Sequence, residues 1–130
     1  MPRAYTVATA ALALGVPIKW VDNVLSHHKL LGVRQHRQGI ARHLGIEGLV
    51  VLALTALLID QLGLPTTKAI FVATEIIRGS GRYTAHQELI IGIDLAAFRG
   101  QLLEKLENAV EIAPVPRRGR PPANKTGRLD

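Results

Sequence analysis

Residues 5–25 read YTVATAALALGVPIKWVDNVL, and this stretch decides the fold. Thr6 is a good N-cap for a helix that begins near Thr6 or Ala8, and Gly15 suits the left-handed residue that ends one. Pro17 fits the first turn of a following helix. In that second helix the residues at helical spacing are Val21, Val24, Leu25 and His28. The stretch therefore predicts two short helices joined by a turn of about three residues, a helix-turn-helix pattern.

A basic hairpin is predicted directly after these helices. The segments from Val33 to Gln35 and from Ile40 to Leu44 are strand-like. Between them lies His36-Arg37-Gln38-Gly39, where Gly39 can adopt the positive φ that a tight hairpin turn needs. We therefore expect a strand pair that carries a cationic turn.

The rest of the chain predicts a helical core. The most apolar helix should run from Glu47 to Leu62 and end at Gly63, and Pro65 should open another that continues to about Arg78. Residues 82–93 resemble two short strands, and their pairing with the core or with another subunit stays open. Asp94 can cap a last helix. One side of that helix carries an apolar stripe of Leu95, Phe98, Leu102, Leu106 and Ala109, which could cover the core or a partner subunit.

These elements place the chain in the mainly α class with small β-hairpins (α+β), as a winged helix-turn-helix with additional core helices. The length of 130 residues suits one domain with a tail. We expect the domain to span residues 1–112. Residues 113–130 have no apolar period and are expected to be disordered on their own.

The charge is concentrated at the two ends of the chain. Its formal net value of +6 divides into +4 for residues 1–47, −2 for residues 48–112 and +4 for residues 113–130. Hydrophobic residues make up 48% of the chain, enough for a buried core. Contact with a polyanion is therefore expected at the ends, while the mildly acidic middle supplies the core.

Several function classes find no support in the sequence. The chain has no cysteine, which excludes thiol nucleophiles, disulfides and zinc sites with Cys ligands. It also lacks a Gly-rich phosphate loop and the common hydrolase motifs, so we expect no enzyme and no cofactor. Four of the five histidines lie between His27 and His43, but their spacing matches no metal-ligand frame, and no metal site is expected.

A membrane span is not expected either. The apolar run from Gly48 to Ile59 lies between Glu47 and Asp60 and has only 12 residues, where a span needs about 20. We interpret it as a buried helix. The expected location is the cytoplasm, on the nucleoid.

The sequence from Tyr5 to Val21 resembles the N-terminal winged helix-turn-helix of MerR-type DNA-binding proteins, a likeness that covers about the first 45 residues. The resemblance implies a recognition helix followed by a hairpin wing. With Val21, Val24 and Leu25 inward, helical geometry leaves Lys19, Trp20, Asn23, Ser26 and His27 facing outward as DNA contacts. The corresponding wing residues are Arg34, His36, Arg37, Gln38 and Arg42. Asp22 beside Lys19 departs from the family pattern of several basic residues, which shifts binding toward the wing.

The tail contains Arg117 followed by Arg118-Gly119-Arg120-Pro121, which resembles the core of an AT-hook. In such a motif the glycine lets the backbone approach the floor of a narrow minor groove, and the arginines follow its negative potential. The resemblance implies that Arg117, Arg118 and Arg120 contact A/T-rich DNA. The alternative is a generic basic tail that binds phosphates loosely.

Together these features predict a sequence-specific protein that binds double-stranded DNA and regulates transcription as a homodimer. The dimer is expected because one small module contacts few base pairs, and the stripe from Leu95 to Ala109 offers an apolar surface. One alternative is a protein-interaction adaptor, such as an antitoxin or a phage-type accessory factor, with an exposed apolar patch on residues 95–110. A second alternative is an architectural DNA binder with little base preference.

Overall fold

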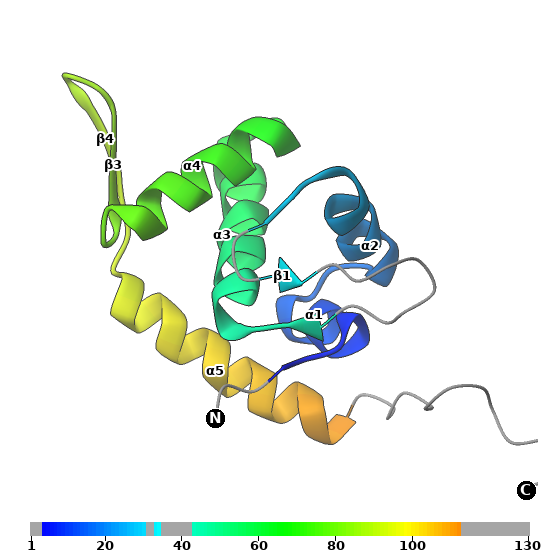
Figure 1. Ribbon diagram of the computed structural model, residues 1–130. Coiled ribbons are helices and arrows are strands. Elements are labelled where there is room, and N and C mark those ends of the chain that lie inside the picture. Colours follow the sequence, from blue (N-terminus) through cyan, green and yellow to red (C-terminus); the bar gives the residue numbers. More distant parts are fainter. Residues whose placement is uncertain (1–3, 31–32, 35–42, 113–130) are drawn as a thin grey trace, which may run out of the picture.

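The computed structural model describes residues 4–30, 33–34 and 43–112, with the side chains of residues 33, 34, 111 and 112 left undescribed. These residues form a mainly helical fold with two antiparallel strand pairs (Figure 1). The elements are α1 (Val7–Leu14), α2 (Ile18–His27), β1 (Val33–Arg34), β2 (His43–Leu44), α3 (Ile46–Leu62), α4 (Thr66–Arg78), β3 (Arg82–His86), β4 (Leu89–Gly92) and α5 (Leu95–Ile112). The predicted class, mainly α with small hairpins, is confirmed.

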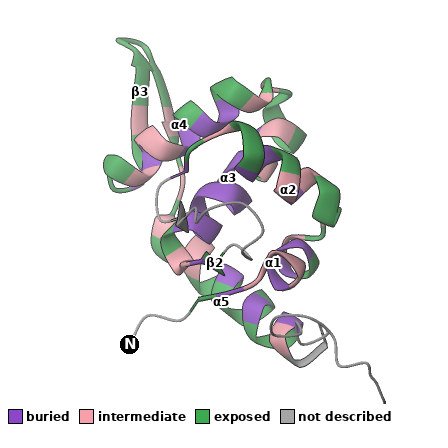
Figure 2. Ribbon diagram, turned by 45° about the vertical axis from the view of Figure 1, so that its right-hand side comes forward, coloured by how far each residue is buried: buried purple, intermediate pink, exposed green. Residues whose placement is uncertain are grey.

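The centre of the fold is α3. Its residues are apolar on all sides, and nearly every residue from Gly48 to Thr55 has less than a tenth of its surface exposed. Figure 2 shows α3 as the most continuously buried helix, with the other helices around it. Gly63 ends α3 in the left-handed conformation, and α4 folds back across it. The prediction that these two helices form the core is confirmed, and the apolar run is a core helix.

The last helix, α5, completes the core from the side of α1 (Figure 1). The Asp94 carboxylate accepts a hydrogen bond from the Ala97 amide at 3.1 Å and caps the helix as predicted. Leu102, Leu106 and Ala109 are buried. The helix that faces α5 is α1, whose buried residues are alanines and a threonine. Their small size lets the two helices approach closely.

The burial of this stripe bears on two arguments from the sequence. The stripe was expected to cover either the core or a partner subunit, and Leu102, Leu106 and Ala109 are buried within the chain itself. An adaptor was expected to expose an apolar patch on residues 95–110, and in that range Leu103 is the large apolar side chain that is mainly exposed. The predicted homodimer therefore needs another surface.

A small sheet joins the start of the chain to the entrance of α3. β1 pairs with β2 in antiparallel register, with Val33 opposite Leu44. Tyr5 adds a bridge on the other side of Leu44, through amide-to-carbonyl bonds of 2.8 and 3.0 Å. The predicted strand pair is confirmed at Val33–Arg34 and His43–Leu44, and the rest of the predicted hairpin, with its turn, lies outside the described residues. The sequence did not reveal Tyr5 as a partner, because the contact spans about forty positions.

The strands β3 and β4 form the second hairpin, which projects from the helical body beyond the end of α4 (Figure 1). Its root is fixed by ring contact between Tyr83 and Phe71 of α4, whose centroids lie 5.8 Å apart in an edge-to-face arrangement. The predicted strands in residues 82–93 are confirmed, and they pair with each other.

Among the described residues, no single helix has both the length and the apolar composition needed to cross a bilayer. The consecutive helices α1 and α2 have a suitable composition only when taken together, and they meet at a bend of 117°.

One buried polar atom in α3 leads to a stability prediction. Thr55 is fully buried, and its Oγ1 has no hydrogen-bond partner among the described residues. Replacing Thr55 with the isosteric Val should raise the free energy of unfolding by about 1 kcal/mol, because an unpaired hydroxyl leaves the core. The matched control is Thr9→Val. Thr9 is also buried, but its hydroxyl accepts a hydrogen bond from Thr6, so this change should lower stability. Urea unfolding measures both, and a destabilised Thr55→Val protein would contradict the assignment.

Candidate nucleic-acid interface

The turn between α1 and α2 has a closed hydrogen-bond pattern. Gly15 adopts φ 70°, its amide donates to the Leu12 carbonyl at 3.3 Å, and the Val16 amide donates to the Ala11 carbonyl at 3.0 Å. These two bonds form a Schellman motif, which stops a helix and redirects the chain. The bend of 117° lies within the range of helix-turn-helix units. Local sequence thus fixes the angle between α1 and α2.

The two faces of α2 differ sharply. Val21, Val24 and Leu25 are buried against the core, as the helical spacing predicted. On the opposite side, Lys19, Asn23, Ser26 and His27 are exposed; Asn23 follows Lys19 by four residues, and Ser26 and His27 follow Asn23 by three and four. Such spacing places side chains in one row along a helix. Four of the predicted contact residues therefore lie together on one polar stripe of α2.

His27 has a defined orientation on this stripe. Its Nδ1 lies 2.8 Å from the backbone carbonyl oxygen of Asn23. A carbonyl can only accept a hydrogen bond, so Nδ1 carries the hydrogen and donates it. This bond holds the ring against the end of α2 and leaves Nε2 free to accept in the neutral form. The stripe thus combines a cationic donor at Lys19, an amide at Asn23 and a fixed imidazole.

Trp20 differs from the expectation that it faces outward. Its side chain is only partly exposed and packs against the hydrophobic core. The position lies between the buried and exposed faces of α2, where a large aromatic ring gains more from partial burial than from full solvation. Trp20 is therefore better described as a residue that anchors α2 than as an outward contact.

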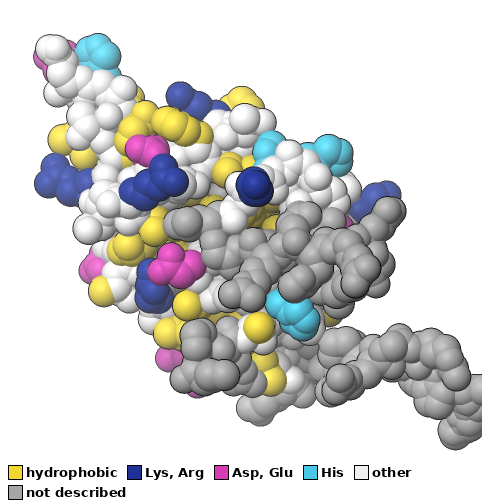
Figure 3. All heavy atoms as spheres, viewed as in Figure 1, with side chains coloured by type: hydrophobic (Ala, Val, Ile, Leu, Met, Phe, Trp, Pro, Cys, Tyr) yellow, Lys and Arg dark blue, Asp and Glu magenta, His cyan; other side chains and the backbone are white. Residues whose placement is uncertain are grey.

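The charge on α2 itself is balanced, since Lys19 is accompanied by the half-buried Asp22. Figure 3 shows lysine and arginine side chains spread over this view of the molecule instead of gathered in one patch. This face of the described residues therefore offers polar groups for specific contacts but little concentrated positive charge.

Most of the remaining predicted site residues lie outside the part of the chain that the structure describes. Arg34 belongs to β1, which the sheet with Tyr5 holds close to the beginning of α1. The wing residues His36, Arg37, Gln38 and Arg42 lie outside the described residues, as do Arg117, Arg118 and Arg120 of the tail. Their assignment stays a prediction from the sequence. Within the described residues, the strand that contacts α1 is β2, through which β1 is joined to the start of the chain.

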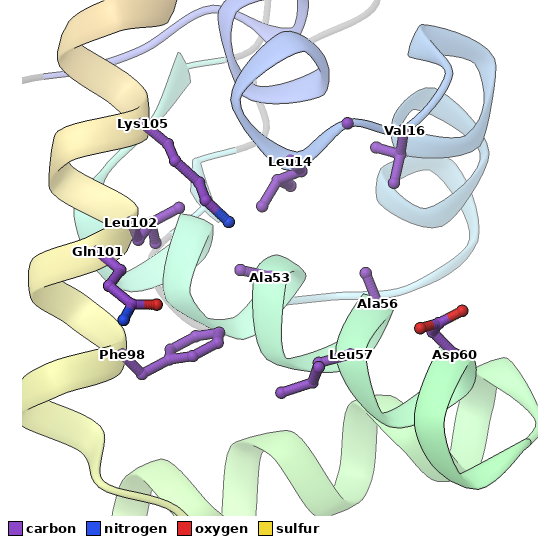
Figure 4. Close-up of a pocket in the computed structure, with 11 residues that line it drawn as sticks. Leu14, Val16, Ala53, Ala56, Leu57, Asp60, Phe98, Gln101, Leu102 and Lys105 are labelled. Atoms are coloured by element: carbon purple, nitrogen blue, oxygen red, sulfur yellow. The ribbon is translucent and has the colours of Figure 1, made fainter.

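A cleft of about 340 Å³ lies beside the turn, between α1, α3 and α5. Its walls are mostly apolar, and its ionisable lining side chains are Asp60 and Lys105. Figure 4 shows Lys105 and Gln101 reaching from α5 toward Leu14 and Ala53, with Asp60 near the opposite end. The lining residues include no hydroxyl, thiol or imidazole group. Sequence analysis missed it because three separate helices form it.

The described residues contain no group of three or more His, Asp or Glu side chains placed to hold a metal ion. Comparison with known proteins found no match to a protein-family model, a curated protein or a solved structure.

Proposed function

We propose that this chain is a sequence-specific DNA-binding protein that regulates transcription, with α1 and α2 as a MerR-like helix-turn-helix and β1 and β2 as the base of its wing. The observation that carries the proposal is the exposed row of Lys19, Asn23, Ser26 and His27 on a helix held at 117° to its predecessor by a closed turn.

The dimensions of α2 suit a DNA groove. A helix fits the major groove of B-DNA, and its N-terminal residues approach base edges. Lys19 lies in the first turn of α2, and Asn23 lies one turn further on the same row. Asn pairs with the N6 and N7 edge of adenine, and Lys donates to O6 and N7 of guanine. The row can therefore discriminate between base pairs.

Affinity must have another source, because α2 has almost no net charge. The basic ends of the chain, with net charges of +4 in residues 1–47 and +4 in residues 113–130, supply it. Phosphate contacts position a protein on DNA, whereas base contacts specify the sequence. The wing and tail arginines would supply the phosphate contacts, while α2 supplies the base contacts.

The experiment that tests the proposal is selection of bound duplexes from a randomised library by the full-length protein near physiological salt. We expect an enriched motif and a large ratio of specific to non-specific affinity in anisotropy titrations of that motif against scrambled DNA. Enrichment of A/T content without a motif would favour the architectural alternative. Retention of no DNA would reject the proposal.

Lys19→Ala and Asn23→Ala should each relax base preference at one or two positions of the selected site. The expected loss of discrimination is about 1–3 kcal/mol per position, measured by titration against single-base variants of the site. Arg78→Ala is the matched control, since it removes one positive charge from an exposed side chain at the far end of α4. Unchanged preference in both α2 variants would remove the row from the base-reading surface.

A further inference from the structure

The hairpin of β3 and β4 has an unpartnered edge. Every residue from Thr84 to Ile90 is exposed, and Leu89 and Ile90 expose 54% and 49% of their surface. Among the described residues the two strands pair only with each other, so this part of the structure leaves both edges of the sheet open. Isolated two-stranded hairpins are marginally stable in water, and open edges pair readily with further strands.

The register identifies which backbone groups face outward. The Ile93 amide donates to the Gly81 carbonyl of the adjoining strand segment at 2.8 Å, and Tyr83 lies opposite Ile91. Backbone groups in an antiparallel ladder alternate in direction, so Ile91 points toward β3. The amide and carbonyl groups of Ile90 and Gly92 therefore lie on the outer edge of β4.

The two edges differ in protection. β3 carries the charged side chain of Arg82, and a charge on an edge strand discourages pairing with another chain. β4 consists of Leu89, Ile90, Ile91 and Gly92 and carries no charge. Its composition favours β-structure, and its edge carries no such protection. The open edge of β4 is thus the one suited to an additional strand.

We propose that β4 pairs in antiparallel orientation with β4 of a second copy of this chain, which joins the two hairpins into a four-stranded sheet. The register centres on Ile90, whose outward amide donates to the Ile90 carbonyl of the second copy and whose carbonyl accepts from the Ile90 amide of that copy. Leu89 then lies opposite Ile91 of the other chain, so both exposed apolar residues of β4 gain apolar neighbours. A register centred on Ile91 would instead place Glu88 opposite Asp94, two like charges.

Charge complementarity supports a second copy as the occupant. Arg82 lies opposite Gly92, and its Cγ is 3.8 Å from the position that a Cβ on Gly92 would take. Within the described residues Arg82 forms no ion pair. In the proposed register Glu88 of the second copy, the turn residue directly before β4, comes to lie beside Gly92, which puts it two strand spacings, or about 10 Å, from Arg82. Because Gly92 has no side chain, the Arg82 and Glu88 side chains can reach each other across it. The two-fold axis of the dimer repeats this contact, so it occurs twice.

This interface deepens the proposed function, because a two-fold dimer would present two α2 helices to a palindromic site. It does not depend on that function, since dimerisation is measured on the full chain without DNA. A dimer that does not bind DNA would reject the proposed function alone. A monomer that binds DNA would reject the proposed interface alone.

Proline substitutions test the edge. Ile90→Pro and Thr84→Pro each remove one outward amide hydrogen from the hairpin, the first at the edge of β4 and the second at the edge of β3. In sedimentation equilibrium across a concentration series, we expect the wild type and Thr84→Pro to be dimers and Ile90→Pro to be a monomer. Circular dichroism checks that each chain is folded. A monomeric wild type overturns the proposal, as does an equal response of the two proline variants.

Charge reversal tests the register. Arg82→Glu and Glu88→Arg each place like charges across Gly92 and should raise the dimer dissociation constant by about tenfold. A mixture of the two variants should form heterodimers with near wild-type affinity, because each contact again joins opposite charges. Glu107→Arg on α5 is the control and should leave dimerisation unchanged. Failure of the mixture to associate more tightly than either variant alone overturns the register.

Discussion

Leu106→Ala is expected to lower the free energy of unfolding by about 3–5 kcal/mol. Leu106 is fully buried at the centre of the stripe by which α5 covers α1 and α3. Truncation removes apolar area from the core and leaves a cavity that rigid neighbouring helices cannot close. Urea unfolding followed by circular dichroism measures the effect.

The same helix provides the control for this prediction. Leu103 is 40% exposed on the outer side of α5, and Leu103→Ala should change stability by less than about 0.5 kcal/mol. The loss in Leu106→Ala should also be independent of protein concentration, since the stripe is used within one chain. A strong concentration dependence would mean that the stripe stabilises a subunit interface instead.

Replacing Arg34, Arg37 and Arg42 together by Ala should weaken binding to every duplex by a similar factor. The binding constant falls with rising salt, and each lost phosphate contact makes the slope of log K against log salt less steep by about 0.9. Loss of three contacts should therefore make the slope less steep by about 2.7. If the contacts contribute little near 1 M salt, this difference amounts to roughly 500-fold in affinity near 0.1 M. Anisotropy titrations of specific and scrambled duplexes over a salt series measure both quantities.

The control for the wing removes the same charge elsewhere. The triple variant of Lys68, Arg78 and Lys105 to Ala lowers the net charge equally but acts on the helical body. It should change the salt slope by much less, because screened charges away from the DNA release few counterions. An altered base preference in the wing variant, without a change of salt slope, would contradict the phosphate role.

Local signals in the sequence predicted the helices well. Thr6 accepts the hydrogen bond from the Thr9 amide that a helix cap requires, and Gly15 and Gly63 adopt the left-handed conformation at helix ends. Each signal acts within about one helical turn, so neighbouring residues are enough to interpret it. The exposed row on α2 was predicted for the same reason, from the spacing of its buried residues.

Other features depended on contacts between distant residues. Three examples are the Tyr5 bridge to Leu44, the partial burial of Trp20 and the cleft beside the turn. Each depends on how separate elements lie relative to one another, and the periodicity of the sequence does not predict that arrangement. Apolar periodicity predicts that one face of a helix will be buried, but it does not predict which other element will cover that face. For this reason the α5 stripe suited a core and a subunit interface equally well until its packing was known.

The sequence by itself determined where helices begin and end, which aliphatic residues of α2 are buried, and where positive charge is concentrated. These properties follow from backbone capping and from the helical repeat, which are local. Only the tertiary structure decided that α5 closes the core and that β4 has an open, uncharged edge. Burial and strand pairing join residues far apart in the chain, and packing in three dimensions selects which apolar surfaces meet.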